Sequence, residues 1–142
     1  MSILKIVAFK IGDEEYGLDI NQVQSIERVL PITRVPNAPT YITGVINLRG
    51  HVTPIIDLRK KLNMGEAEIT ESTRILITMN EDMELGWIVD ETSDVIDLDP
   101  EVIQTTTSSS VYNCEYFSEI AKIEDRLIIL LKLSELMRET AV

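Results

Sequence analysis

The stretch V-I-N-L-R-G-H-V-T-P-I-I-D-L, residues Val45 to Leu58, decides how this chain folds. Apolar Ile46 and Leu48 alternate with polar neighbours, which is the two-residue period of a strand with one buried face. Gly50 can take a positive φ angle, so a turn is expected there. The pattern predicts two strands joined at Gly50, with Arg49 at the tip of the first and directed away from its buried face.

Short strands and few helices are expected along the rest of the chain. Apolar runs bounded by polar turns predict strands over residues 3–11, 16–20, 73–79, 85–90, 95–98, 117–123 and 126–132. Short helices are expected over residues 58–62, with Asp57 as N-cap, and over residues 133–138. Many short strands at close spacing favour small antiparallel barrels.

One segment has a helical period instead. Ile20, Val23, Ile26 and Leu30 are separated by three, three and four residues, which is the spacing of an amphipathic helix. Pro31 cannot continue the interior of a helix. The spacing therefore predicts a helix from Ile20 to Leu30.

Composition bounds the class of protein. Of the 142 residues 44% are apolar, which suffices for one domain or for two small subdomains that share a core. The single cysteine, Cys114, excludes an internal disulfide and a multi-cysteine metal site, which fits a reducing cytosol. No signal peptide is indicated, and the longest aliphatic run, Leu127 to Leu131, is too short to span a bilayer. A soluble, cytoplasmic protein is expected.

The formal net charge of −11 is unevenly distributed. Residues 1–71 carry 8 basic and 9 acidic groups, whereas residues 72–142 carry 5 and 15. This balance disfavours nonspecific binding to nucleic acid, which depends on neutralising phosphates. The two halves are compatible with different surfaces for different partners, and equally with the ordinary solvation of an acidic protein.

Few residues favour catalysis. The sequence has no glycine-rich phosphate-binding loop. His51 is the only histidine, and Arg49 and Asp57 do not form a proton-transfer chain with it. Adjacent acids such as Glu14 and Glu15 point to opposite faces of a strand, so they do not converge on a metal or a reacting group. We expect no catalytic residue, no metal and no cofactor.

Several motifs resemble those of one family. The run P-N-A-P-T-Y-I-T-G-V-I-N-L-R-G at residues 36–50, continued by V-T-P-I-I-D-L-R at residues 52–59, strongly resembles the CheW family of coupling proteins in bacterial chemotaxis. Three further motifs agree in order: G-D-E-E-Y-G at 12–17, L-G-W-I-V-D-E-T-S-D-V at 85–95, and E-I-A-K-I-E-D-R-L-I-I-L-L at 119–131. The resemblance covers nearly the whole chain, and its central block is long and gap-free.

This resemblance implies a mainly β fold. It consists of two small five-stranded antiparallel barrels, Src-homology-3-like in shape, with short helices. The chain would be a single CheW-like domain, with one subdomain over approximately residues 1–70 and the other over approximately 71–142. Terminal segments can cross into the other barrel.

The implied function is that of a non-enzymatic adaptor. Its partners would be the regulatory domain of the chemotaxis histidine kinase and the cytoplasmic tip of methyl-accepting chemoreceptors. The protein would be cytoplasmic and would reach membrane receptor arrays only through those receptors. No nucleic-acid partner is implied.

The implied receptor- and kinase-binding surface surrounds Arg49. Its members are Val23, Ser25, Glu27, Gly44, Asn47, Leu48 and Arg49. A guanidinium fork suits recognition of a carboxylate, either on a partner or within the chain as a structural pair. Periodicity alone places Val23 and Leu48 in the core.

The acid that often pairs with this arginine in the family is replaced here. The usual V-x-E-I reads Val23-Gln24-Ser25-Ile26, so Ser25 stands at the position of the glutamate. Glu27 lies two residues further on, and on a helix it would face another way. A pair between Arg49 and Glu27 is thus one alternative, and an unpaired Arg49 is the other.

Three further features have open interpretations. Trp87 is either a core residue or, if exposed, an anchor at an interface. The polar run Gln104 to Ser110 reads as a loop, and it lacks an aromatic residue that some relatives carry for kinase contact. Val111 or Tyr112 could supply that contact.

Two other functions are compatible with the sequence. One is a ligand-binding or enzymatic barrel protein that uses the cleft between the barrels, with His51, Arg49 and Asp57 as polar groups. The other is a stand-alone homologue of the kinase's regulatory domain that acts as adaptor for a non-chemotactic receptor–kinase pair.

Overall fold

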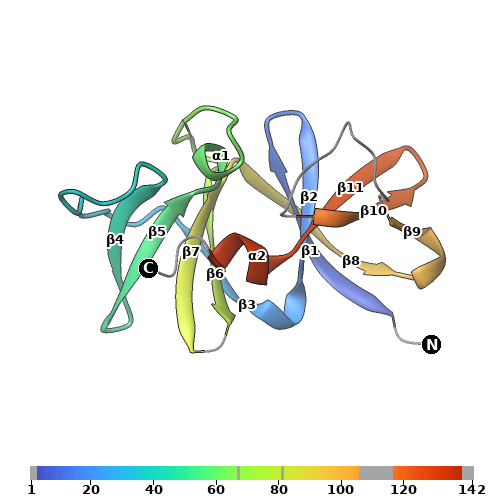
Figure 1. The fold of residues 1–142 in the computed structure, drawn as a ribbon, viewed down its shortest axis with the longest axis horizontal. Coiled ribbons are helices and arrows are strands. Elements are labelled where there is room, and N and C mark those ends of the chain that lie inside the picture. The colour runs from blue at the N-terminus through green and yellow to red at the C-terminus, as the bar shows by residue number, and fades with distance from the viewer. Residues whose placement is uncertain (1–2, 67, 81, 106–116, 139–142) are drawn as a thin grey trace. The chain divides into compact units, whose positions relative to one another are not determined.

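The structure, a computed structural model, describes residues 3–66, 68–80, 82–105 and 117–138. These residues form two β-sheets and a few short helices (Figure 1). The expected mainly β fold with short helices is therefore confirmed, although one of the two sheets has six strands where each barrel was expected to have five. Most of the run 104–110, together with Val111, Tyr112 and Cys114, lies outside the described residues.

The chain divides into two compact units. The continuous unit comprises residues 23–92, and the split unit comprises residues 1–22 and 93–142. Residue 70 lies inside the continuous unit, and the N-terminal 22 residues belong with the C-terminal part of the chain. The reason is that β2 pairs with β11, which is more than a hundred residues away in sequence.

The continuous unit contains a five-stranded sheet with the strand order β3-β6-β7-β5-β4. Its elements are β3 (Val23–Arg28), β4 (Ile42–Leu48), β5 (His51–Asp57), α1 (Leu58–Lys61), β6 (Arg74–Asn80) and β7 (Met83–Val89). The sheet is antiparallel except where β5 runs parallel to β7. The strands predicted at residues 45–58, 73–79 and 85–90 are all present.

The split unit contains a six-stranded sheet with the order β8-β1-β2-β11-β10-β9. Its elements are β1 (Leu4–Ile11), β2 (Glu14–Asp19), β8 (Glu91–Leu98), β9 (Ile103–Thr105), β10 (Phe117–Ile123), β11 (Arg126–Leu131) and α2 (Leu133–Arg138), with short 3-10 helices at Ile20–Gln22 and Pro100–Val102. Strand β2 runs parallel to β11 between two antiparallel hairpins. This hairpin–parallel–hairpin connectivity repeats that of the continuous unit, although the sequence shows no internal repeat.

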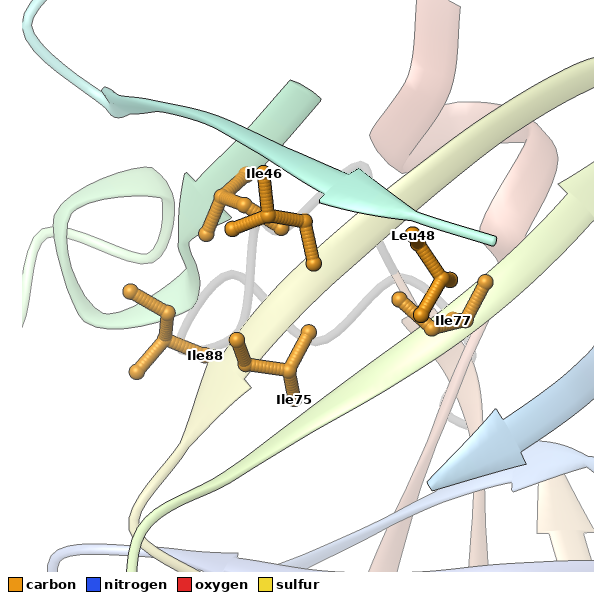
Figure 2. Close-up of a cluster of buried hydrophobic side chains, with 6 residues drawn as sticks. Ile46, Leu48, Ile75, Ile77 and Ile88 are labelled. Atoms are coloured by element: carbon orange, nitrogen blue, oxygen red, sulfur yellow. The ribbon is translucent and has the colours of Figure 1, made fainter. Parts of the chain in front are cut away.

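The core of the continuous unit consists of aliphatic side chains on one face of its sheet. They are Ile46, Leu48, Ile55, Ile75, Ile77 and Ile88. Figure 2 shows how the labelled members on β4, β6 and β7 project toward one another, and Ile55 joins them from β5. Each is at most 7% exposed. β-branched side chains suit this pleated, close-packed environment. The alternation of Ile46 and Leu48 in the opening motif thus marks the core face, as predicted.

The other face of the same sheet is also buried. Trp87 is 1% exposed, lies opposite Leu76 in register, and donates a hydrogen bond from Nε1 to Thr78 Oγ1 at 2.8 Å. A buried indole N–H needs such a partner. Of the two interpretations of Trp87, the structure therefore supports a core residue.

Helix α1 is held in place by caps and ion pairs. The Asp57 carboxylate accepts from the backbone N–H of Arg59 at 3.0 Å and of Lys60 at 3.4 Å, so the expected N-cap is confirmed. The Arg59 guanidinium makes a bidentate pair with Asp90 at the end of β7. This hydrogen bond from Arg59 to Asp90 raises the pKa of the guanidinium. The Lys61 ammonium lies 4.3 Å from the centroid of the Tyr41 ring.

The predicted helix from Ile20 to Leu30 is wrong. Only Ile20–Gln22 is helical, as a 3-10 turn, and the chain then enters β3, which pairs antiparallel with β6. Exposure alternates along the strand, and Ile26, assigned to the buried stripe of a helix, is 43% exposed. The apolar Ile26 stands on the exposed face of this strand, and counting it with Val23 and Leu30 produced the false helical spacing.

A backbone bridge joins the segment after β3 to β4. The N–H of Thr33 donates to the carbonyl of Val45 at 2.9 Å, and the N–H of Val45 donates to the carbonyl of Thr33 at 2.8 Å. Gly44 makes this approach possible, because a Cβ at that position would lie 2.2 Å from the carbonyl oxygen of Thr33. The bridge therefore requires glycine at position 44.

Ile75→Ala is expected to lower the free energy of unfolding by about 2–5 kcal/mol, since it leaves a cavity among fully buried side chains. Urea denaturation of the variant and the wild type measures the loss. Val52→Ala is the control, because Val52 is 71% exposed and its truncation should change stability by less than about 0.5 kcal/mol. Equal effects of the two substitutions would contradict the assignment of the core.

Candidate functional site

The Arg49-Gly50 dipeptide forms a two-residue turn between β4 and β5. Leu48 pairs with His51, so Arg49 and Gly50 alone connect the strands. Both have positive φ angles, 52° at Arg49 and 84° at Gly50, as a type I′ turn requires. Arg49 thus lies in the turn itself, one residue beyond the end of β4, where its side chain is 69% exposed.

Asn47 stabilises this turn. Its Oδ1 accepts a hydrogen bond from the backbone N–H of Gly50 at 3.2 Å. Asparagine is common beside turns because its short amide bonds the backbone a few residues away. Asn47 therefore fixes the backbone from which Arg49 projects.

Arg49 forms an ion pair with Glu27. Arg49 Nη2 lies 3.3 Å from Glu27 Oε2, and the glutamate side chain is 22% exposed. The pair exists because residues 23–28 form a strand rather than the predicted helix, and on a strand Glu27 shares a face with Ser25. Of the two alternatives for Arg49, the structure therefore shows the pair with Glu27.

Ser25 and Val23 lie half-buried on β3. Ser25 Oγ is shielded from solvent, and within the described part of the chain it has no hydrogen-bond partner. A hydroxyl there supplies no charge to Arg49, whereas the carboxylate of Glu27, two residues further along, pairs with it. At the position where the resemblance implies a glutamate, β3 thus holds Ser25, and the acid of this strand that pairs with Arg49 is Glu27.

Gly44 and Leu48 are placed behind this surface rather than on it. Leu48 is 7% exposed and packs in the core of the continuous unit. Gly44 is buried at the bridge to Thr33. Both residues set the position of the β4–β5 hairpin, whereas Asn47 and Arg49 are exposed.

Sequence reasoning missed one exposed apolar side chain beside the turn. Val52 is 71% exposed and lies opposite Asn47 in register. The alternation of β5 could have indicated it, since Thr53 and Ile55 face inward and Val52 must face outward.

The groups of the enzymatic alternative do not converge. His51 is exposed at the start of β5, while Asp57 is 3% exposed at its end and is used as the cap of α1. A strand of this length separates its ends by about 20 Å. Within the described ranges no group of three His, Cys, Asp or Glu side chains could hold a metal ion. No helix in those ranges is long and apolar enough to cross a membrane.

The comparison with family models decides the relationship. The model of the CheW-like domain matches residues 5–141. This chain belongs to the CheW family.

Individual members of the family are similar along most of their length. The chemotaxis protein CheW of Bacillus subtilis (strain 168) is 47% identical over 131 residues, which cover 87% of this chain and 80% of that protein. The probable chemotaxis protein CheW of Rhizobium etli is 38% identical over 137 residues, covering 96% and 88%. The crystal structure of the scaffolding protein TtCheW from Thermoanaerobacter tengcongensis matches with a TM-score of 0.88 and 35% identity, covering 96% of this chain and 94% of that one.

Arg49→Ala is expected to change the free energy of unfolding of this CheW-family chain by less than about 1 kcal/mol, because its ion pair is solvent-exposed. Urea denaturation measures the change. Arg59→Ala is the matched comparison, since it removes a half-buried bidentate pair and should cost about 1–3 kcal/mol. If Arg49→Ala cost as much as Arg59→Ala, Arg49 would be a structural arginine.

Proposed function

We propose that this chain is a non-enzymatic adaptor that couples chemoreceptors to the chemotaxis histidine kinase. The observation that carries the proposal is the 47% identity to the chemotaxis protein CheW of Bacillus subtilis. The match to a crystal structure described as a scaffolding protein supports the same function. The adaptor acts in the cytoplasm and reaches receptor arrays at the membrane through the receptors it binds.

The turn at Arg49 is the surface on which the adaptor meets a partner. A two-residue turn, fixed by Asn47, presents a guanidinium that is 69% exposed and that, among the described residues, is hydrogen-bonded once, to Glu27. The remaining N–H donors of the fork are available to a carboxylate of the kinase's regulatory domain or of the receptor tip. Val23, Ser25 and Glu27 flank this contact on β3, while Gly44 and Leu48 hold the hairpin in register.

Coupling follows from the presence of two partners on one chain. A receptor bound through one contact and a kinase bound through another are held at high effective concentration, so individually weak contacts add through the array. A change of receptor state then shifts the population of active kinase through the adaptor.

The first test combines kinase autophosphorylation with co-pelleting on receptor-containing membranes, with and without this protein. The kinase should pellet with the membranes and come under receptor control only when the chain is present. If neither pelleting nor control depended on the chain, the proposed function would be wrong although the family and fold would stand.

Arg49→Glu should weaken kinase co-pelleting about tenfold or more, because reversing the charge turns an attraction into a repulsion. Arg28→Glu is the matched control, since it makes the same charge change at an exposed position of β3. The double variant Glu27→Arg with Arg49→Glu restores the internal ion pair. Recovery of binding in the double variant would mean that the pair itself, and not recognition of Arg49 by a partner carboxylate, is required.

A further inference from the structure

A row of apolar side chains in the split unit runs from the interior to an open groove. Phe9 on β1 pairs with Tyr16 on β2, Tyr16 with Ile129 on β11, and Ile129 with Ile120 on β10. Residues paired in register lie on one face of a sheet. Phe9 and Tyr16 are at most 5% exposed, whereas Ile129 and Ile120 are half-buried.

The open end of this row is a groove. Leu127, two residues before Ile129 on β11, is 60% exposed. Together with Ile120 and Ile129 it lines a hollow of about 640 Å³. A large aliphatic side chain exposed in a concavity gains from being covered by another apolar group.

The rim of the groove is acidic. Its carboxylates are Asp13 from the β1–β2 turn, Glu14 and Glu15 from the start of β2, and Asp125 from the β10–β11 turn. They face two cations, Lys10 and Arg126. Four carboxylates and two cations give the rim a net negative charge. Asp94, just outside the rim, adds a further negative charge.

Arg126 does not offset this charge for an approaching ligand. Its Nε and Nη2 each lie 2.9 Å from an oxygen of Glu15, and its Nη2 and Nη1 lie 3.1 and 3.3 Å from the oxygens of Asp94. One guanidinium is thus shared by two carboxylates, and these bonds raise its pKa. With this cation already surrounded by acids, the exposed Asp13 and Asp125 dominate the field at the groove mouth.

We propose that this groove docks a segment of a partner protein in which an aliphatic side chain is flanked by lysine or arginine. The aliphatic group covers Leu127, Ile120 and Ile129, and the flanking cations pair with Asp13 and Asp125. A second copy of this chain fits poorly, because the chain as a whole carries a formal net charge of −11 and would be repelled by the acidic rim. The groove lies in the split unit, so this docking goes beyond the function proposed for Arg49 in the continuous unit.

The test uses a fluorescein-labelled amphipathic peptide built from leucine and lysine, with a leucine–glutamate peptide of equal length as its counterpart. Fluorescence anisotropy measures affinity, and methyl NMR reports the site. The lysine peptide should bind and shift the methyl signals of Ile120, Leu127 and Ile129. Leu127→Thr should weaken binding about tenfold, whereas Val52→Thr, at a valine of the continuous unit that is also largely exposed, should leave it unchanged.

The charge contribution is tested separately. Asp13→Asn with Asp125→Asn should weaken the lysine peptide about threefold or more and flatten the dependence of its affinity on salt. Circular-dichroism melting checks that each variant is folded; exposed positions are expected to leave the midpoint unchanged. Arg49→Ala should not alter peptide binding, because Arg49 lies in the continuous unit. A negative result for the docking proposal would therefore leave the adaptor proposal standing, and the reverse also holds.

Three outcomes would overturn the proposal. Equal weakening by Leu127→Thr and Val52→Thr would mean diffuse electrostatic attraction to an acidic protein. Equal binding of the lysine and glutamate peptides would mean that the acidic rim is irrelevant. Self-association in sedimentation velocity that is lost in Leu127→Thr would mean that a second copy occupies the groove.

Discussion

The close backbone contact between Thr33 and Val45 is the constraint on which the continuous unit depends. Two reciprocal hydrogen bonds tie the segment that leaves β3 to the middle of β4, and they form only because position 44 has no side chain. The contact brings the edge strand β3 back toward the β4–β5 hairpin. The contact therefore helps to bring Glu27 next to Arg49, which lies 22 residues further along the chain.

The exposed site is built on buried residues. The aliphatic core fixes the hairpin through Ile46 and Leu48, the turn fixes the backbone of Arg49 through Asn47, and the strand β3 supplies Glu27. Arg49 therefore projects from a backbone that the turn holds, beside an ion-pair partner that the sheet holds. This arrangement suits recognition of a surface better than proton transfer, for which His51 and Asp57 lie at opposite ends of β5.

Much of this architecture could be predicted from sequence, and the exceptions have physical causes. The hairpin at Gly50, the cap at Asp57 and the later hairpins follow from local signals, namely alternation, turn residues and a capping carboxylate. Strand β3 could not be predicted in the same way, because the exposed apolar Ile26 gives it a helical spacing and its conformation is set by pairing with β6, about fifty residues away. The ion pair of Arg49 depended on that strand, so its acid could not be assigned before the fold was known.

The parallel pairing of β2 with β11 bears on how the chain is made. The continuous unit needs only residues 23–92, whereas the split unit needs β2 near the start and β11 near the end, as in the contact of Glu15 with Arg126 across 111 residues. Contacts between distant residues form late, because the intervening chain must first be closed into a loop. During synthesis the continuous unit can therefore fold before the last strands have been made. Until β11 emerges from the ribosome, one edge of β2 in the first hairpin stays unpaired.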